Sequence, residues 1–277
     1  MHMNTGKLLR IRRIWKHKRA VIIPFDHGQY GGVVSGLEDP QKLAEHIAST
    51  HADAVLVTPG VLQTVLPALG DLGVILRLDG AFTKYTPVVG DYQTICSVEQ
   101  AVRLGADAGI VFTFIGTEFD ATSLQRLGMT AEQADFWGLP LIAEVLPPSL
   151  LNNHFERDVF LAQSQTGGLE EETMTISRIV AEHGADIVKT RYSGDVASFS
   201  KVTKTCGVKV IVAGGPNTNR TDEALLQFAY DCVQADASGI VFGRSVWQHP
   251  NMEKLIGALC AIVHDDESVS SALKFLR

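Results

Sequence analysis

Lys189 stands in the run D-I-V-K-T-R-Y-S-G-D, residues 186–195, whose first half has the apolar, β-branched composition of a buried strand. A lysine in such a strand must either reach solvent or lose hydration, and the loss of hydration favours the neutral amine. A neutral amine is the nucleophile that Schiff-base chemistry needs. Lys189 is therefore the first catalytic candidate.

Further candidates lie where other apolar runs end, namely Asp26, His27, Arg77, Asp79, Glu144 and Arg191. Glu144 is the strongest of these, because an inward carboxylate within L-I-A-E-V-L is costly to bury unless it has a role. A purely structural ion pair between Glu144 and Lys189 is the alternative interpretation. Arg77 and Asp79 share a strand face, so they could pair with each other or with Lys189. Asp26 could cap a turn, and His27 is expected to orient or pack rather than act as a base.

Two glycine-containing segments predict a phosphate site. Gly214 and Gly215 follow one apolar run, and Gly243 and Arg244 follow the next. Backbone N–H groups of small residues cradle phosphate, and an arginine adds charge-assisted hydrogen bonds. Glycines after a strand often serve only the turn, but two neighbouring segments of this kind favour one shared cup.

The elements that must position these residues follow from eight apolar, β-branched runs: Ala20–Phe25, Ala54–Thr58, Val74–Leu78, Ala108–Phe112, Pro140–Leu146, Ile187–Thr190, Val208–Ala213 and Gly239–Phe242. Helical patterns separate them, with start signals at Asp39-Pro40, at Ser97 and at Asp195, whose helix is expected to stop at Gly207. Strands that alternate with helices pair in parallel.

Ala-Asp recurs just before four of these runs, at Asp53, Asp107, Asp186 and Asp236, which predicts a repeated helix-to-strand turn. Eight such units in one chain favour a single-domain (β/α)₈ (TIM) barrel over a doubly wound sheet, and no G-x-G-x-x-G follows the first strand. Residues 1–19 are expected to close one end of the barrel and residues 265–277 to form a helical tail. In such a barrel all the candidates converge at the carboxyl ends of the strands.

Composition narrows the class. The 277 residues are 45% hydrophobic and carry a net charge of −7, so no general attraction to nucleic acid or anionic membranes is expected. The basic run of residues 7–19 could be an RNA-binding arm, but its interleaved apolar residues favour an amphipathic closing segment. Neither a membrane span nor a secretory signal is evident, so a cytoplasmic enzyme is expected. The four cysteines lack C-x-x-C spacing and are predicted to be free thiols in the core.

With these residues in place, the chain resembles a known family. The runs A-V-I-I-P-F-D-H-G, I-V-K-T-R-Y-S-G-D, V-I-V-A-G-G-P and G-I-V-F-G-R-S-V-W-Q are similar to those of class I aldolases related to the archaeal-type fructose-bisphosphate aldolases, the aminodideoxyheptulosonate synthases and the phospho-autoinducer-2 thiolase. The resemblance implies an aldehyde-lyase with Lys189 as the Schiff-base lysine. It also implies that Asp26 assists proton transfer and that Gly214, Gly215, Gly243 and Arg244 hold phosphate.

The resemblance further implies a phosphorylated sugar as substrate, no metal or other cofactor, and a homo-oligomer built of pentameric rings. His27, Arg77, Asp79 and Arg191 are expected to contact the substrate. One departure stands out, because Leu146 occupies the position of the tyrosine that serves as acid/base in these aldolases. Glu144, two residues earlier on the same strand face, is the expected substitute, which puts fructose bisphosphate itself in doubt as the substrate.

Two other functions stay open. Asp26, His27, Asp79 and Glu144 could hold a metal ion in a barrel lyase, although Lys189 in the same pocket would oppose a cation. A barrel that binds a phosphorylated sugar without turnover is the second alternative, and the loss of the tyrosine makes it conceivable. The loops that carry Lys84, Tyr85, His154 and Arg157 offer no basis for separating substrate contacts from surface residues.

Overall fold

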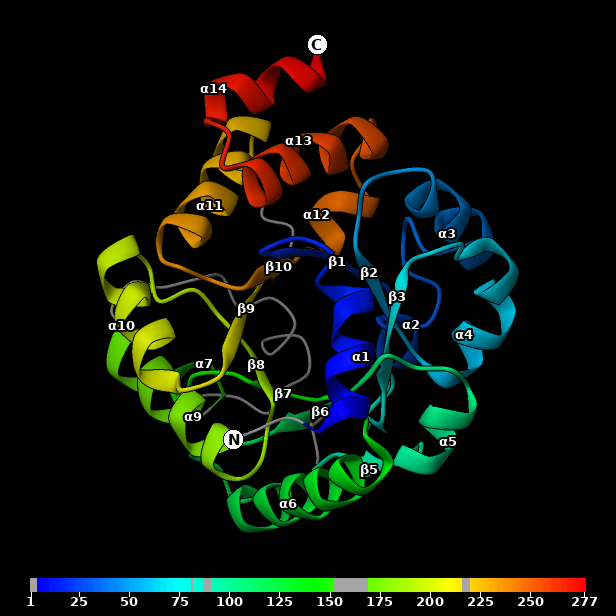
Figure 1. Cartoon of the computed structure of the whole chain (residues 1–277), viewed down its shortest axis with the longest axis vertical. Coiled ribbons are helices and arrows are strands. Elements are labelled where there is room, and N and C mark those ends of the chain that lie inside the picture. The colour runs from blue at the N-terminus through cyan, green and yellow to red at the C-terminus, as the bar shows by residue number, and fades with distance from the viewer. Residues whose placement is uncertain (1–3, 81, 87–90, 152–168, 216–219) are drawn as a thin grey trace.

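Eight parallel strands close into a barrel in the computed structural model, which describes residues 4–80, 82–86, 91–151, 169–215 and 220–277 (Figure 1). Each predicted run lies within one residue of an observed strand at both ends, so the predicted (β/α)₈ architecture is confirmed. The strands are β1 (Ala20–Pro24), β2 (Ala54–Val57), β3 (Gly73–Arg77), β6 (Ala108–Thr113), β7 (Leu141–Val145), β8 (Ile187–Thr190), β9 (Lys209–Ala213) and β10 (Gly239–Val241).

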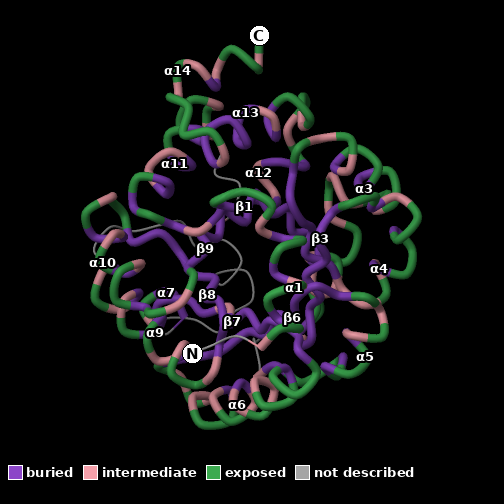
Figure 2. Tube along the Cα trace, in the orientation of Figure 1, coloured by how far each residue is buried: buried purple, intermediate pink, exposed green. Residues whose placement is uncertain are grey.

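Helices surround the barrel, and the buried trace in Figure 2 runs along the strands they cover. The predicted caps are confirmed, because Asp39, Ser97 and Asp195 each accept a hydrogen bond from a backbone amide three residues on. The helices are α1 (Thr5–Ile14), α2 (Gly28–Gly31), α3 (Pro40–Ala48), α4 (Pro59–Val65), α5 (Val98–Arg103), α6 (Asp120–Trp137), α7 (Pro148–Leu151), α9 (Glu170–Glu182), α10 (Val196–Cys206), α11 (Asp222–Gln234), α12 (Arg244–Trp247), α13 (Met252–Asp265) and α14 (Val269–Ala272).

The alternation of side chains along each strand builds two apolar layers. Outward residues such as Val188 pack under the helices, whereas inward ones such as Ile75, Ile142 and Ile187 fill the barrel. Two residues further along the same inward faces stand Arg77, Glu144 and Lys189. These charged groups therefore rest on an apolar floor at the carboxyl ends of the strands.

The repeated Ala-Asp turns close the opposite end of the barrel. Asp53, Asp107 and Asp186 are buried, and each accepts a hydrogen bond of 2.7–2.9 Å from the first amides of a neighbouring strand, at Val21, Val74 and Leu141. Each also contacts a basic side chain: His264 for Asp53, Arg13 for Asp107 and Lys7 for Asp186. Asp236 does not repeat this pattern, because it is exposed and takes a left-handed conformation with φ 60°. The predicted repeat is thus structural in three of its four copies.

Helix α1 lies over this end of the barrel, as Figure 1 shows in blue. Ile11 and Ile14 pack on the inward layer, and the Trp15 indole donates to the Ser238 carbonyl at 2.8 Å. Lys7 is buried and pairs with Asp186 at 2.9 Å. The basic and apolar residues of this segment are thus used within the fold.

One element was not predicted: β4 (Asp79–Gly80) pairs antiparallel with β5 (Gln93–Thr94) directly after β3. Cys96, Cys206, Cys232 and Cys260 are free and buried, as predicted. No helix among the described residues has both the length and the hydropathy needed to span a membrane.

The Asp186 turn yields a stability prediction. Asp186→Ala leaves the Lys7 ammonium, 3% exposed, without its nearest counterion and removes the acceptor for the Leu141 amide. We expect a loss of roughly 3–5 kcal/mol in the free energy of unfolding, measured by urea denaturation. Asp236→Asn, at the exposed fourth copy of the turn, is the matched control and should change stability by less than about 0.5 kcal/mol. Equal losses in both variants would contradict the assignment.

Candidate active site

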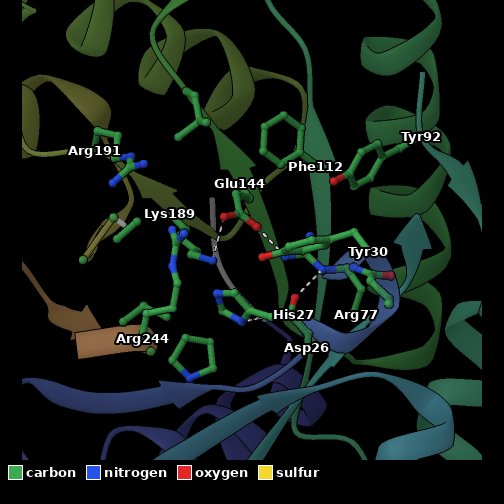
Figure 3. A pocket seen from close by; sticks show the side chains of 18 residues that line it. Asp26, His27, Tyr30, Arg77, Tyr92, Phe112, Glu144, Lys189, Arg191 and Arg244 are labelled. Carbon is green, nitrogen blue, oxygen red and sulfur yellow. Dashed lines mark hydrogen bonds and ion pairs between the residues drawn. The ribbon is translucent and has the colours of Figure 1, made fainter. Parts of the chain in front are cut away.

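A pocket opens at the carboxyl ends of the strands, and side chains from most of the barrel reach into it (Figure 3). Ten of the eleven predicted site residues line it: Asp26, His27, Arg77, Glu144, Lys189, Arg191, Gly214, Gly215, Gly243 and Arg244. Asp79 does not line it and is fully buried behind it. The sequence therefore predicted the location of the pocket and most of its lining.

Lys189 and Glu144 occupy paired positions on the adjacent strands β8 and β7, so their side chains leave the sheet side by side. The Lys189 Nζ lies 2.6 Å from Glu144 Oε1, and the Arg77 guanidinium donates to Glu144 Oε2. Lys189 is only 6% exposed. The strand composition suggested apolar surroundings for this amine, but its nearest charged neighbour is the Glu144 carboxylate.

Arg77 joins three carboxylates into one network. Besides Glu144, its Nε donates to Asp26 Oδ2 at 3.0 Å and its Nη1 to Asp79 Oδ1 at 3.4 Å. The other oxygen of Asp79 accepts from the Phe112 amide at 2.6 Å. The three carboxylates that the sequence offered as metal ligands are thus all bonded to the Arg77 guanidinium. This arrangement disfavours a metal ion bound by the same oxygens.

Burial and charge set the protonation of these groups. Burial raises the pKa of Glu144, but Lys189 and Arg77 together outweigh it and bring that pKa down to about 2. Burial raises the pKa of Asp79 to about 6 against the pull of Arg77. Burial also lowers the pKa of His27 to about 4, although Asp26 opposes the change. At neutral pH Glu144 is therefore a carboxylate and His27 a neutral imidazole.

Cationic groups gather on the side of the pocket formed by β8, β9 and β10. Arg191 is 7% exposed, and its Nη1 has no hydrogen-bond partner among the described residues. Burial, and then the charge of Arg244, lower the pKa of Arg191 to about 10. Gly215 adopts φ +79°, and the Arg191 guanidinium occupies the space that a Cβ at Gly215 would need. This side can therefore accept an anion.

Aromatic residues form the opposite side, and sequence reasoning missed them. Tyr30, Tyr92 and Phe112 line the pocket beside Leu146. Tyr30 lies in the four-residue helix α2, which has no periodicity to mark it. Tyr92 precedes β5 and is held by Arg126 of α6, which donates to its carbonyl. Only their proximity along the chain to Asp26 and β4 could have pointed to them.

Several residues left undecided by the sequence can now be placed. Tyr85 is 84% exposed, and Lys84 lies beside its ring, 5.2 Å from the centroid. Both belong to the surface. His154, Arg157 and most of the segment 147–168 lie outside the described residues.

Comparisons with known proteins agree with this geometry. A family model described as DeoC/LacD family aldolase matches residues 20–249. A 2-amino-3,7-dideoxy-D-threo-hept-6-ulosonate synthase from Halobacterium salinarum is 33% identical over 274 residues, covering 98% of this chain and 96% of its own. A 3-hydroxy-5-phosphonooxypentane-2,4-dione thiolase from Yersinia pseudotuberculosis is 30% identical over 274 residues, covering 98% and 86%.

Among solved structures, an archaeal fructose-1,6-bisphosphate aldolase has a TM-score of 0.78 at 27% identity, over 93% of this chain and 99% of its own. That structure is described with the catalytic lysine covalently bound to the carbinolamine intermediate of the substrate. The chain therefore belongs to the DeoC/LacD aldolase family and is an aldehyde-lyase of the class I, Schiff-base type.

Proposed function

We propose that this aldolase forms its Schiff base at Lys189 with a phosphorylated ketose or a related carbonyl compound, and makes or breaks the adjacent C–C bond. The observation that carries the proposal is the 2.6 Å contact between Lys189 and Glu144 at the floor of a pocket whose other side holds Arg191 and Gly215. A nucleophile, a proton acceptor and an anion site then lie in one cavity.

The amine step uses Glu144 and Asp26, two carboxylates that line the same pocket as Lys189. The ammonium must lose a proton before nitrogen attacks the carbonyl, and Glu144 is the base in contact with it. Attack gives a carbinolamine, and loss of water gives a protonated imine. Asp26, held by Arg77 at 3.0 Å, faces the same space and assists the proton transfers of dehydration. The contact supports a role for Glu144 at the amine, in place of the acid/base role at the substrate hydroxyl that the sequence suggested.

The anion site supports a phosphate on the substrate. Burial, and then the positive charge of Arg244, lower the pKa of Arg191, because like charges close together disfavour each other. A phosphate dianion between them would relieve that repulsion and accept charge-assisted hydrogen bonds. Binding energy gained there holds the carbonyl within reach of Lys189. The phosphonooxy and bisphosphate groups in the names of two similar proteins agree with this choice.

Borohydride trapping tests the Schiff base directly. Reduction in the presence of dihydroxyacetone phosphate, fructose 1-phosphate or fructose 1,6-bisphosphate should fix a stable adduct, which peptide mass mapping places on Lys189. Lys189→Met should give no adduct while keeping its far-UV circular dichroism, because only the amine is removed. If no phosphorylated ketose gives an adduct with the unsubstituted enzyme, the proposal is wrong.

Glu144→Gln separates a catalytic from a purely structural carboxylate. The amide keeps the shape of the side chain but cannot take the proton of Lys189, so adduct formation should slow by about 10²–10⁴-fold per folded molecule. The fraction folded is measured by thermal denaturation of the same sample. A variant that melts earlier yet reacts at the normal rate would leave Glu144 with a structural role alone.

Gly215→Ala tests the anion site. A Cβ at Gly215 would collide with the Arg191 guanidinium and strain a backbone at φ +79°. The half-saturating concentration of dihydroxyacetone phosphate in trapping should rise by about tenfold, the equivalent of one lost charge-assisted contact. Trapping with dihydroxyacetone, which lacks the phosphate, should stay unchanged. Gly128→Ala, where a Cβ meets nothing within 4 Å, is the matched control.

A further inference from the structure

We infer that Tyr30 is a catalytic residue of this enzyme and carries the substrate hydroxyl proton while the C–C bond breaks or forms. The inference rests on the proposed function, since it assigns a group to the second half of the same reaction. It starts from a gap in the site, because Lys189, Glu144 and Asp26 account for the chemistry at nitrogen but leave the hydroxyl proton without a dedicated group.

Glu144 is poorly suited to that proton. Both of its oxygens are engaged, one by Lys189 and the other by Arg77. After Schiff-base formation the Lys189 nitrogen is still cationic and Arg77 still charged, so the carboxylate stays weakly basic. Leu146, at the position where related aldolases carry a tyrosine, has no proton to move. Asp79 lies behind the pocket and His27 is neutral.

Tyr30 is a phenol inside the pocket with its ring held in place. The ring stacks on Phe82, with centroids 5.6 Å apart and 27° between the planes, and lies 5.6 Å from the His27 ring on another side. His27 in turn makes an edge contact with Trp247 at 5.5 Å. In Figure 3 the side chain of Tyr30 extends into the cavity among Glu144, Arg77 and Asp26. Its orientation is therefore fixed by packing.

The phenol shares one pocket with the amine and the anion site, because Tyr30, Lys189 and Arg244 all line it. A substrate whose phosphate lies near Arg244 and whose carbonyl carbon lies at Lys189 therefore occupies the same cavity as this phenol. Burial raises the pKa of Tyr30, so the phenol keeps its proton at neutral pH and works as a relay rather than as a phenolate.

The step balances with the groups present. In cleavage, the electron pair of the breaking C–C bond moves into the imine and gives an enamine, and the neighbouring hydroxyl becomes an aldehyde. The hydroxyl proton goes to the Tyr30 oxygen as Tyr30 passes its own proton to the Asp26 carboxylate. Condensation runs the same transfers in reverse, with Tyr30 donating to the forming alkoxide.

Tyr92 offers a matched control in the same pocket. It is also a phenol that lines the cavity, and the charged groups that act on it most strongly are Arg77 and Asp79. In Figure 3 it lies on the side of the pocket away from Arg191 and Arg244. Tyr92→Phe therefore removes a phenol oxygen from the pocket, as Tyr30→Phe does, but at a different position.

The test measures two steps in two variants. Tyr30→Phe should trap dihydroxyacetone phosphate on Lys189 at a rate within about threefold of the unsubstituted enzyme. Its kcat should fall by about 10²–10³-fold, with little change in KM, for cleavage of whichever of fructose 1-phosphate and fructose 1,6-bisphosphate reacts faster. Tyr92→Phe should lose less than about fivefold in either step.

Each contrary outcome is distinct. Normal cleavage by Tyr30→Phe overturns the assignment, and so does an equal loss in both variants, because that reports general damage to the pocket. Loss of trapping in Tyr30→Phe would place the phenol in the amine step and also overturns it. Retained trapping shows that the variant is folded. Trapping by the unsubstituted enzyme is measured before the variants. If it forms no adduct with any ketose phosphate, the proposed function itself is wrong.

Discussion

The arrangement of the site depends on the contacts of the Glu144 carboxylate with two basic side chains. Glu144 lies between Lys189 and Arg77, and the three side chains stand on an apolar floor where water cannot replace any partner. An unpaired charge at such a place costs several kcal/mol, so removing any one of the three side chains leaves a charge of another unbalanced. The same contact lowers the pKa of Glu144 to about 2, which keeps it ionised throughout the neutral range. A protonated imine at Lys189 would be positively charged beside the Glu144 carboxylate, and that charge is lost when C–C cleavage turns the imine into an enamine.

The barrel explains why these groups meet. Ile75, Ile142 and Ile187 fill one inward layer, and Arg77, Glu144 and Lys189 form the next layer on the same strand faces. Parallel pairing puts Glu144 beside Lys189 without any loop between them. At the other end, three of the Ala-Asp turns fasten the start of one strand to its neighbour. The strands thus hold the proposed catalytic side chains in position, while the loops after β1 and β9 position the groups proposed to contact the substrate.

Much of this was readable in the sequence because the relevant signals are local. A β-branched run marks a strand wherever it lies, and a polar residue at its end marks the catalytic face. The charged surroundings of Lys189 were not readable in this way, because the carboxylate nearest to its amine comes from a different strand. A single strand suggests desolvation, whereas only the paired register shows the carboxylate that compensates it. Tyr30 and Tyr92 were not predicted as site residues for a related reason. Tyr30 lies in a one-turn helix and Tyr92 lies before a two-residue strand, and elements this short have no sequence periodicity.

Leu146, which the family resemblance places where related aldolases carry a tyrosine, raises the question of which group supplies a hydroxyl to this pocket. All eight strands end around one central space, so a hydroxyl needed there can be supplied from any of them. Leu146 belongs to an apolar cluster with Phe82, Phe112 and Phe114, next to which the Tyr30 ring packs. Leu146 and Tyr30 line the same pocket, so the phenol that follows β1 supplies a hydroxyl to the cavity where the leucine has none.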